Sequence, residues 1–154
     1  MTNIIFTFAG LMLIDRLGRR QLLIIGSLGY IISLTGVSFA FYQQLHPQWI
    51  AMFIFTFIAA HGIGQGTVIW VFISEIFPNR IRAKGQSFGA GVHWVFAALI
   101  TLVGPSIIAI YQTNPWPIFS FFAFMMVLQL VFSVLIMPET KGKSLEEINQ
   151  VINI

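Results

Sequence analysis

The chain has 154 residues, of which 57% are hydrophobic and only 8% are charged. Soluble domains carry roughly 25% charged residues, so this composition excludes an ordinary water-soluble fold and indicates an integral membrane protein. The net charge of +3 comes from short clusters at turns and not from a basic face, which argues against a nucleic-acid partner. The chain contains no cysteine, which excludes a disulfide framework and a thiolate metal site.

Five apolar segments predict an all-α fold, a polytopic transmembrane helix bundle over residues 1–137. A helix needs about 20 apolar residues to cross the hydrocarbon core. The first segment, residues 1–14, is shorter and is expected to be the second half of a helix, as in a fragment of a longer protein; whether Met1 is the natural start stays open. Complete spans are expected at residues 21–42, 49–73, 86–110 and 117–137.

The middle of the third segment interrupts the pattern of a continuous helix. Within residues 61–67 three glycines alternate with polar residues, and glycine weakens a helix. Non-helical backbone at membrane depth is tolerated where protein or a watery cavity surrounds it, so this segment is a candidate broken helix. His61 and Gln65 lie one helical turn apart here, and each either lines a cavity or makes a hydrogen bond to another helix.

Residues 138–154 are expected to form a tail in water. Pro138 is expected to close the last span, because proline lacks the N–H group that a helix interior requires. Ser144 followed by Glu147 is a capping-box pattern, which predicts a short amphipathic helix within this tail.

Charge is confined to three places: residues 15–20, residues 75–84 and the tail. The two turns between them, residues 43–48 and 111–117, carry no formal charge. Because successive turns alternate between the two faces of a membrane, all the charged turns lie on one face, and the positive-inside rule makes that face cytoplasmic. We therefore expect a multi-pass protein of the plasma or inner membrane, with its charged turns and tail in the cytoplasm.

The charged turns also carry three motifs in order. They are Asp15-Arg16-Leu17-Gly18-Arg19-Arg20, Ser74-Glu75-Ile76-Phe77-Pro78 followed by Arg80 and Arg82, and Pro138-Glu139-Thr140-Lys141-Gly142. In sequence and spacing they resemble signatures of the sugar-porter family of the major facilitator superfamily, over essentially the whole chain. The resemblance implies the partial carboxy-terminal half of a major facilitator fold, from the second half of helix eight through helix twelve and the tail. It also implies a missing partner, the amino-terminal six-helix domain.

Arginines and carboxylates at neighbouring turns can form bidentate, charge-assisted pairs. In the family such pairs latch the cytoplasmic ends of the helices while the carrier faces outward. The resemblance implies the same role, as a cytoplasmic gate, for the following residues: Asp15, Arg16, Arg19, Arg20, Glu75, Arg80, Arg82 and Glu139. The alternative is that the basic residues only fix the topology.

The resemblance further implies a substrate site at the middle of the membrane. The residues that match the family's sugar-binding positions are Asn3, Gly66, Trp70, His93 and Trp94. A side-chain amide can donate to and accept from a hydroxyl, and a tryptophan ring supplies an apolar wall. The chain departs from the family at residues 66–70, which lack two prolines, and at Ala97, where the family often has an asparagine.

The implied function is transport of a monosaccharide by alternating access, with a chain that is incomplete and not transport-competent alone. The alternative is a non-transporting membrane remnant or a helix-bundle interaction protein. An enzyme is not expected, because no His, Asp and Glu cluster has metal-ligand spacing and no nucleophile has an adjacent base. No cofactor is expected. The sugar, and the choice between proton symport and uniport, stay open.

Overall fold

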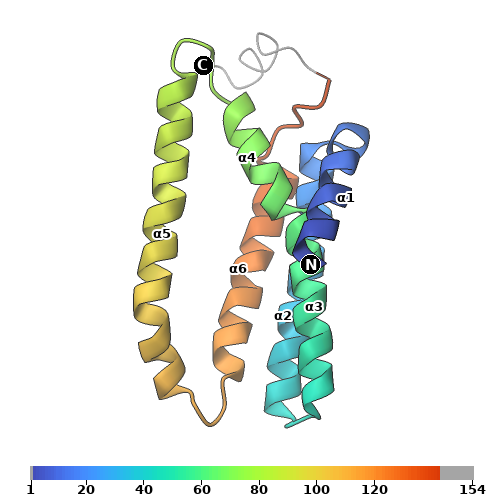
Figure 1. Cartoon of the computed structure of the whole chain (residues 1–154), viewed down its shortest axis with the longest axis vertical. Helices are drawn as coiled ribbons and strands as arrows, with labels where there is room; N and C mark the ends of the chain where they lie inside the picture. Colours follow the sequence, from blue (N-terminus) through green and yellow to red (C-terminus); the bar gives the residue numbers. More distant parts are fainter. Residues whose placement is uncertain (1, 143–154) are drawn as a thin grey trace.

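The computed structural model describes residues 2–142 and contains six α-helices in that range (Figure 1). They are α1 (Thr2–Leu17), α2 (Arg19–Tyr42), α3 (Pro47–Ile63), α4 (Gln65–Glu75), α5 (Arg82–Ile110) and α6 (Trp116–Leu135). Four stretches are long and apolar enough to cross a membrane: α2, α3 together with α4, α5, and α6. The all-helical fold predicted from the apolar segments is therefore present. The short helix predicted in the tail lies outside the described residues.

The helix ends differ in detail from those predicted. α2 and α5 begin at Arg19 and Arg82, earlier than predicted, because a helix continues beyond the hydrocarbon where arginine side chains reach the polar interface. α6 ends at Leu135, before the predicted residue 137. The N–H groups of Ile136 and Met137 both donate to the carbonyl of Phe132, which closes its last turn.

The bundle is organised around α2, which packs against both α3 and α6. A buried cluster fills the junction of these three helices and consists of Tyr30, Leu34, Ala60 and Ala123. α1 packs mainly against α3, whereas α5 contacts α4 and otherwise stands apart from the bundle in Figure 1. Gly85 is the only buried residue of α5. The apolar side chains of α5 are therefore available to lipid or to further protein.

The backbone breaks at Gly64, between α3 and α4, where the glycine-rich sequence predicts it. Gly64 lies against Gly26 of α2, so closely that a Cβ atom at Gly26 would come within 2.8 Å of the Gly64 Cα atom and 2.6 Å of Gln65 Oε1. Carbon atoms prefer separations of about 3.5–4.0 Å, so only glycine fits at position 26. The Gly62 carbonyl accepts a hydrogen bond from Thr67 Oγ1 at 2.8 Å. Close backbone packing and a side-chain hydroxyl thus stabilise the break.

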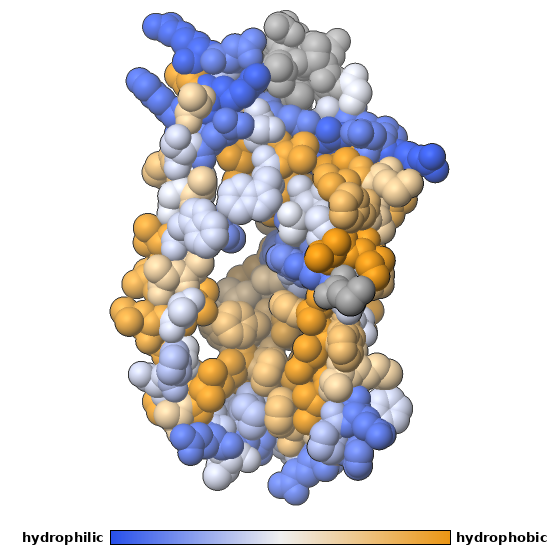
Figure 2. Space-filling model, viewed as in Figure 1, coloured by the Kyte–Doolittle hydropathy of each residue, from blue (hydrophilic) through white to orange (hydrophobic). Residues whose placement is uncertain are grey.

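The charged turns gather at one end of the molecule. Figure 1 places the α1–α2 turn, the end of α4, the start of α5 and the end of α6 at this end. Figure 2 shows mostly hydrophobic surface across the middle of the molecule and hydrophilic surface at its two ends. The turns at the opposite end, residues 43–46 and 111–115, are polar but carry no formal charge. The separation of charged from uncharged turns that the sequence predicts is therefore present in the fold.

Candidate functional site

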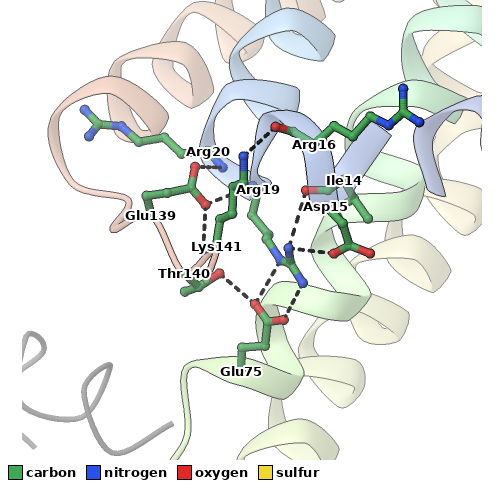
Figure 3. A network of polar contacts seen from close by, with 9 residues as sticks. All are labelled: Ile14, Asp15, Arg16, Arg19, Arg20, Glu75, Glu139, Thr140 and Lys141. Atoms are coloured by element: carbon green, nitrogen blue, oxygen red, sulfur yellow. Dashed lines mark hydrogen bonds and ion pairs between the residues drawn. The ribbon is translucent and has the colours of Figure 1, made fainter. Parts of the chain in front are cut away.

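Arg19 and Glu75 form an ion pair at the charged end, between the start of α2 and the end of α4 (Figure 3). Arg19 Nη2 lies 2.8 Å from Glu75 Oε1, and Arg19 Nε lies 3.2 Å from Glu75 Oε2. The Arg19 side chain is 13% exposed and the Glu75 side chain 21%. A bidentate pair that is shielded from water in this way is stronger than an ion pair at the open surface. It ties α2 to α4.

Arg19 has two further acceptors at the end of α1. Its Nη1 atom donates to Asp15 Oδ1 at 3.1 Å and to the Ile14 carbonyl at 3.4 Å. Asp15 is 81% exposed, so water screens its charge and its contact with Arg19 contributes less than the contact with Glu75. A single guanidinium therefore joins the ends of three helices, as Figure 3 shows.

Glu139 acts on the same end of α2, but through the backbone. Its carboxylate accepts hydrogen bonds from the N–H groups of Arg19 and Arg20 at 3.0 and 3.1 Å. The first N–H groups of a helix have no partner within the helix, and the helix dipole favours a negative charge there. Gly18 leaves room for the carboxylate, since a Cβ atom at Gly18 would lie 2.5 Å from Glu139 Oε2. Glu139 thus caps a helix rather than pairing with a guanidinium.

Arg20 makes the reciprocal contact with the end of α6. Its Nε atom donates to the Ser133 carbonyl at 3.1 Å, and its Nη2 atom donates to the Val134 carbonyl. The last carbonyls of a helix also lack partners, and a positive charge there is favourable. Each of the two helix ends is therefore capped by a charged side chain from the opposite segment.

The tail contributes two more contacts that the sequence did not single out as gate residues. Thr140 Oγ1 donates to Glu75 Oε2 at 2.6 Å, and Lys141 Nζ donates to the Arg16 carbonyl at 2.5 Å, at the end of α1. Both side chains stand within the third charged motif, so the motif itself was the available signal. Its residues join the ends of α1, α2 and α4 to α6.

Arg16, Arg80 and Arg82 lie outside this network as far as their side chains are concerned. Arg16 and Arg80 are exposed. Arg82 Nε donates to the Phe77 carbonyl at 3.4 Å, and its buried Nη2 atom has no hydrogen-bond partner among residues 2–142. The reason is geometric: Arg82 begins α5 and folds back onto its own turn instead of crossing to Glu75.

Three of the residues expected at the substrate site, Trp70, His93 and Trp94, lie together where α4 meets α5. The Trp70 and His93 rings meet edge-on with centroids 5.2 Å apart, and the His93 and Trp94 rings do so at 5.4 Å. Gly66 stands one helical turn before Trp70 on α4, so the two share a face. Trp70 is 44% exposed and Trp94 65%. This face can offer aromatic walls and an imidazole to a polar ligand.

Asn3 is exposed on α1. Its Oδ1 atom accepts a hydrogen bond from Thr7 Oγ1 at 3.4 Å, and both residues line a shallow depression of about 270 Å³ on α1. The contacts of the described residues do not join Asn3 to Trp70 or His93. The spacing between Asn3 and Asp15 along the chain predicts the depth of Asn3 along α1. It does not predict which helices α1 packs against.

His61 and Gln65 each make a hydrogen bond to another helix, one of the two alternatives that the sequence left open. His61 Nδ1 lies 2.5 Å from Tyr30 Oη on α2, and Gln65 Nε2 donates to Ser27 Oγ, also on α2, at 3.4 Å. The Tyr30 ring is stacked on Phe57, with centroids 4.6 Å apart. Tyr30 stands in an uninterrupted apolar span, so nothing in its neighbourhood in the sequence distinguishes it.

Comparison with known proteins identifies relatives along the whole chain. The family model described as "Sugar (and other) transporter" matches residues 1–152. The D-xylose-proton symporter of Escherichia coli K12 is 36% identical over 155 residues, a match that covers 95% of this chain and 30% of the symporter. The arabinose-proton symporter of Bacillus subtilis is 34% identical over 155 residues, which covers 97% of this chain and 32% of that protein. The chain thus spans about a third of the length of these relatives.

Solved structures of the E. coli xylose transporter XylE have the same fold over this region. A crystal structure of a double-tryptophan mutant matches with a TM-score of 0.91 and 31% identity, over 97% of this chain and 32% of that one. The inward-open conformation matches with a TM-score of 0.86 and 33% identity, over 97% of this chain and 33% of that one. The family model, the relatives and the charged motifs agree: the chain belongs to the sugar-porter family of the major facilitator superfamily.

Proposed function

We propose that this chain is the carboxy-terminal part of a sugar carrier, which moves a monosaccharide across the membrane by alternating access. The amino-terminal six-helix domain would supply the opposite wall of the cavity, so the chain alone would not transport. The relatives that support this proposal are named as carriers of xylose and arabinose, and they are about three times as long as this chain. The charged end would face the cytoplasm, because basic turns stay on that side.

The position of α4 is the observation that carries this proposal. α4 begins at the Gly64 break, carries Trp70 near its middle and ends at Glu75, which Arg19 holds. It has 11 residues, so it is about 16 Å long at the usual rise of an α-helix. A tilt of this short helix about the glycine break would move Trp70 and separate the ion pair in one step. A binding residue and a gating residue on one rigid element can couple substrate binding to opening.

The network around Glu75 would act as the gate of this carrier. With the pair formed, the ends of α1, α2, α4 and α6 are held together, and the cytoplasmic side is closed. Opening would require loss of two hydrogen bonds from Arg19 and one from Thr140. Charge-assisted hydrogen bonds contribute about 1.5–3 kcal/mol each. Substrate binding would have to favour the open arrangement by about the sum of the contributions of the bonds that break.

The chemistry of the α4–α5 face fits a neutral, hydroxyl-rich substrate. Trp70 and Trp94 present ring faces and indole N–H groups, and His93 can donate or accept. None of these residues carries a full charge when the histidine is neutral, so no permanent charge attracts an anion or a cation. Aromatic stacking with hydroxyl hydrogen bonds is a reversible mode of binding, as a carrier requires.

The test is transport by a chimera in which residues 1–154 replace the matching third of the E. coli D-xylose-proton symporter. Proteoliposomes that contain the chimera are expected to take up labelled D-xylose or another labelled monosaccharide, with and without an imposed proton gradient. The Trp70→Ala variant is expected to lose most of this uptake. The matched control is Trp49→Ala, because Trp49 lies at the start of α3, far along the chain from the α4–α5 face.

Uptake by the parent chimera that survives Trp70→Ala unchanged would contradict the assignment of the site. Absence of uptake of every labelled monosaccharide, in a chimera that folds and inserts, would contradict the carrier proposal. The second result would favour a helix-bundle interaction protein.

A further inference from the structure

We propose that His61 is a substrate-binding residue, and that Tyr30 positions it so that Nε2–H points to the substrate. This inference rests on the proposed function and adds to it a hydrogen-bond donor together with the residue that orients that donor. Three observations support it: the contact between His61 and Tyr30, the position of Gly66 beside His61, and the face of α4 that Gly66 shares with Trp70.

The hydrogen bond to Tyr30 sets the tautomer of His61. Tyr30 Oη and His61 Nδ1 are 2.5 Å apart, and the Tyr30 side chain is buried, with 6% of the residue exposed. If Nδ1 carried the proton, the buried Tyr30 hydroxyl would have no acceptor for its own hydrogen, and an unsatisfied buried donor is costly. We therefore assign the Tyr30 hydroxyl as donor to Nδ1. The proton of the neutral imidazole is then on Nε2.

Nε2 lies against Gly66, where a side chain would cover it. A Cβ atom at Gly66 would come within 3.1 Å of His61 Nε2 and 2.9 Å of the His61 carbonyl. Nε2 makes no hydrogen bond to any of residues 2–142, and His61 is half-buried. The glycine thus leaves the one remaining polar atom of the imidazole uncovered. The donor is fixed in direction but has no partner within the described chain.

The uncovered donor is on the side of α4 that carries the candidate substrate residues. Gly66 and Trp70 are four residues apart on α4 and share a face. Trp70 meets His93 of α5 edge-on. His61, Gly66, Trp70 and His93 therefore form one continuous strip. A hydroxyl-rich ligand bound against Trp70 would present an acceptor oxygen to His61 Nε2–H.

Two substitutions of His61 separate binding from a purely structural role. Glutamine places an amide N–H where Nε2 lies but has no acceptor at the position of Nδ1, whereas asparagine keeps an acceptor near Nδ1 and has no group at Nε2. In the chimera described above, His61→Gln is expected to retain the KM for sugar uptake to within about 3-fold. His61→Asn is expected to raise it by about 10-fold, the effect of one lost hydrogen bond.

Analogues of the sugar identify the bonded hydroxyl. Among the monodeoxy analogues of the transported sugar, one should show the same KM with His61 and with His61→Asn, because it lacks the acceptor for Nε2–H. The position of Tyr30 is tested in the 154-residue chain itself, labelled with ¹⁵N-histidine in lipid nanodiscs. The chain has only 3 histidines, so their ring nitrogens can be resolved. Nε2 of His61 is expected to be protonated and Nδ1 not, and Tyr30→Phe is expected to abolish this preference.

The outcomes are distinct. Equal KM values for the two His61 variants, or a defect in His61→Gln alone, would overturn the inference while the carrier proposal stands. A protonated Nδ1 would overturn the role of Tyr30 and, with it, the orientation of the donor. A parent chimera that takes up no sugar would overturn the carrier proposal, and the inference with it.

Discussion

Replacement of Glu75 by glutamine tests how strongly the ion pair holds the charged end together. Glu75 accepts hydrogen bonds at 2.8 and 3.2 Å from Arg19 and at 2.6 Å from Thr140. Glutamine keeps one acceptor oxygen and loses the charge. The side chain of Arg19, which is 13% exposed, then loses its best partner.

Two energies bound the loss in the free energy of unfolding that Glu75→Gln should cause. A hydrogen bond between charged groups contributes about 1.5–3 kcal/mol, and one such bond is lost outright. A buried charge left without any partner costs about 3–5 kcal/mol, but Arg19 keeps Asp15 and the Ile14 carbonyl. We therefore expect Glu75→Gln to lower the free energy of unfolding by about 2 kcal/mol.

The assay is unfolding of the chain in mixed micelles, followed by the fluorescence of its 4 tryptophans. A double-mutant cycle with Arg19→Met isolates the pair, and its coupling energy should be about 2 kcal/mol. Asp15→Asn is the control, because Asp15 is 81% exposed and its pair with Arg19 should contribute at most about 0.5 kcal/mol. A coupling energy between Arg19 and Glu75 no larger than that of the control would refute the reasoning. If Glu75 has the gating role proposed above, the same loss of about 2 kcal/mol in the chimera would correspond to a roughly 30-fold shift toward the inward-facing state. A cysteine probe at the charged end would detect this shift.

Two glycine substitutions, each with a matched control, test the close contacts. Gly26→Ala should lower the free energy of unfolding by about 1–3 kcal/mol through overpacking against the break, whereas Gly104→Ala, with nothing within 4 Å of its Cβ, should be neutral or stabilising; equal effects would contradict the packing. Gly18→Ala combines a φ of +98° with a Cβ only 2.5 Å from Glu139 Oε2, and it should expose the first amides of α2 to hydrogen exchange. Gly142 has a φ of +70°, but nothing lies within 4 Å of its Cβ position, so Gly142→Ala should leave those amides protected. If both variants expose the first amides of α2 equally, backbone strain and not loss of the cap is responsible.

The sequence predicted the features that depend on composition along the chain. Apolar length predicted helices long enough to cross a membrane, glycine spacing predicted the break before α4, and the placement of charge predicted the common end of the charged turns. The family resemblance placed Arg19 and Glu75 in the same expected gate but did not assign them to each other. The lengths of the helices and the break follow from local sequence, because bilayer thickness and helix propensity act on each segment separately.

The contacts that sequence alone did not predict depend on how helices approach one another. Glu139 was expected in the gate, but its distance from the first amides of α2 depends on where α6 ends in space. Arg82 has the same charge as Arg19, and only the fold shows that it turns back onto Phe77. The bond from Tyr30 to His61 joins residues 31 positions apart on two different helices, and no periodicity along either helix encodes it.

The exchange of caps between α2 and α6 has a consequence for the order in which the chain is made. Proteins fold from the amino terminus during synthesis, so the ribosome releases the start of α2 and later Glu75 well before Glu139 and Thr140. Until those last residues emerge, the first amides of α2 lack their carboxylate and the carboxylate of Glu75 lacks its hydroxyl donor. Nascent chains that stop short of residue 139 should therefore insert into the membrane without the hydrogen bonds that Glu139 and Thr140 make. Quality-control proteases would then have access to this end of the bundle.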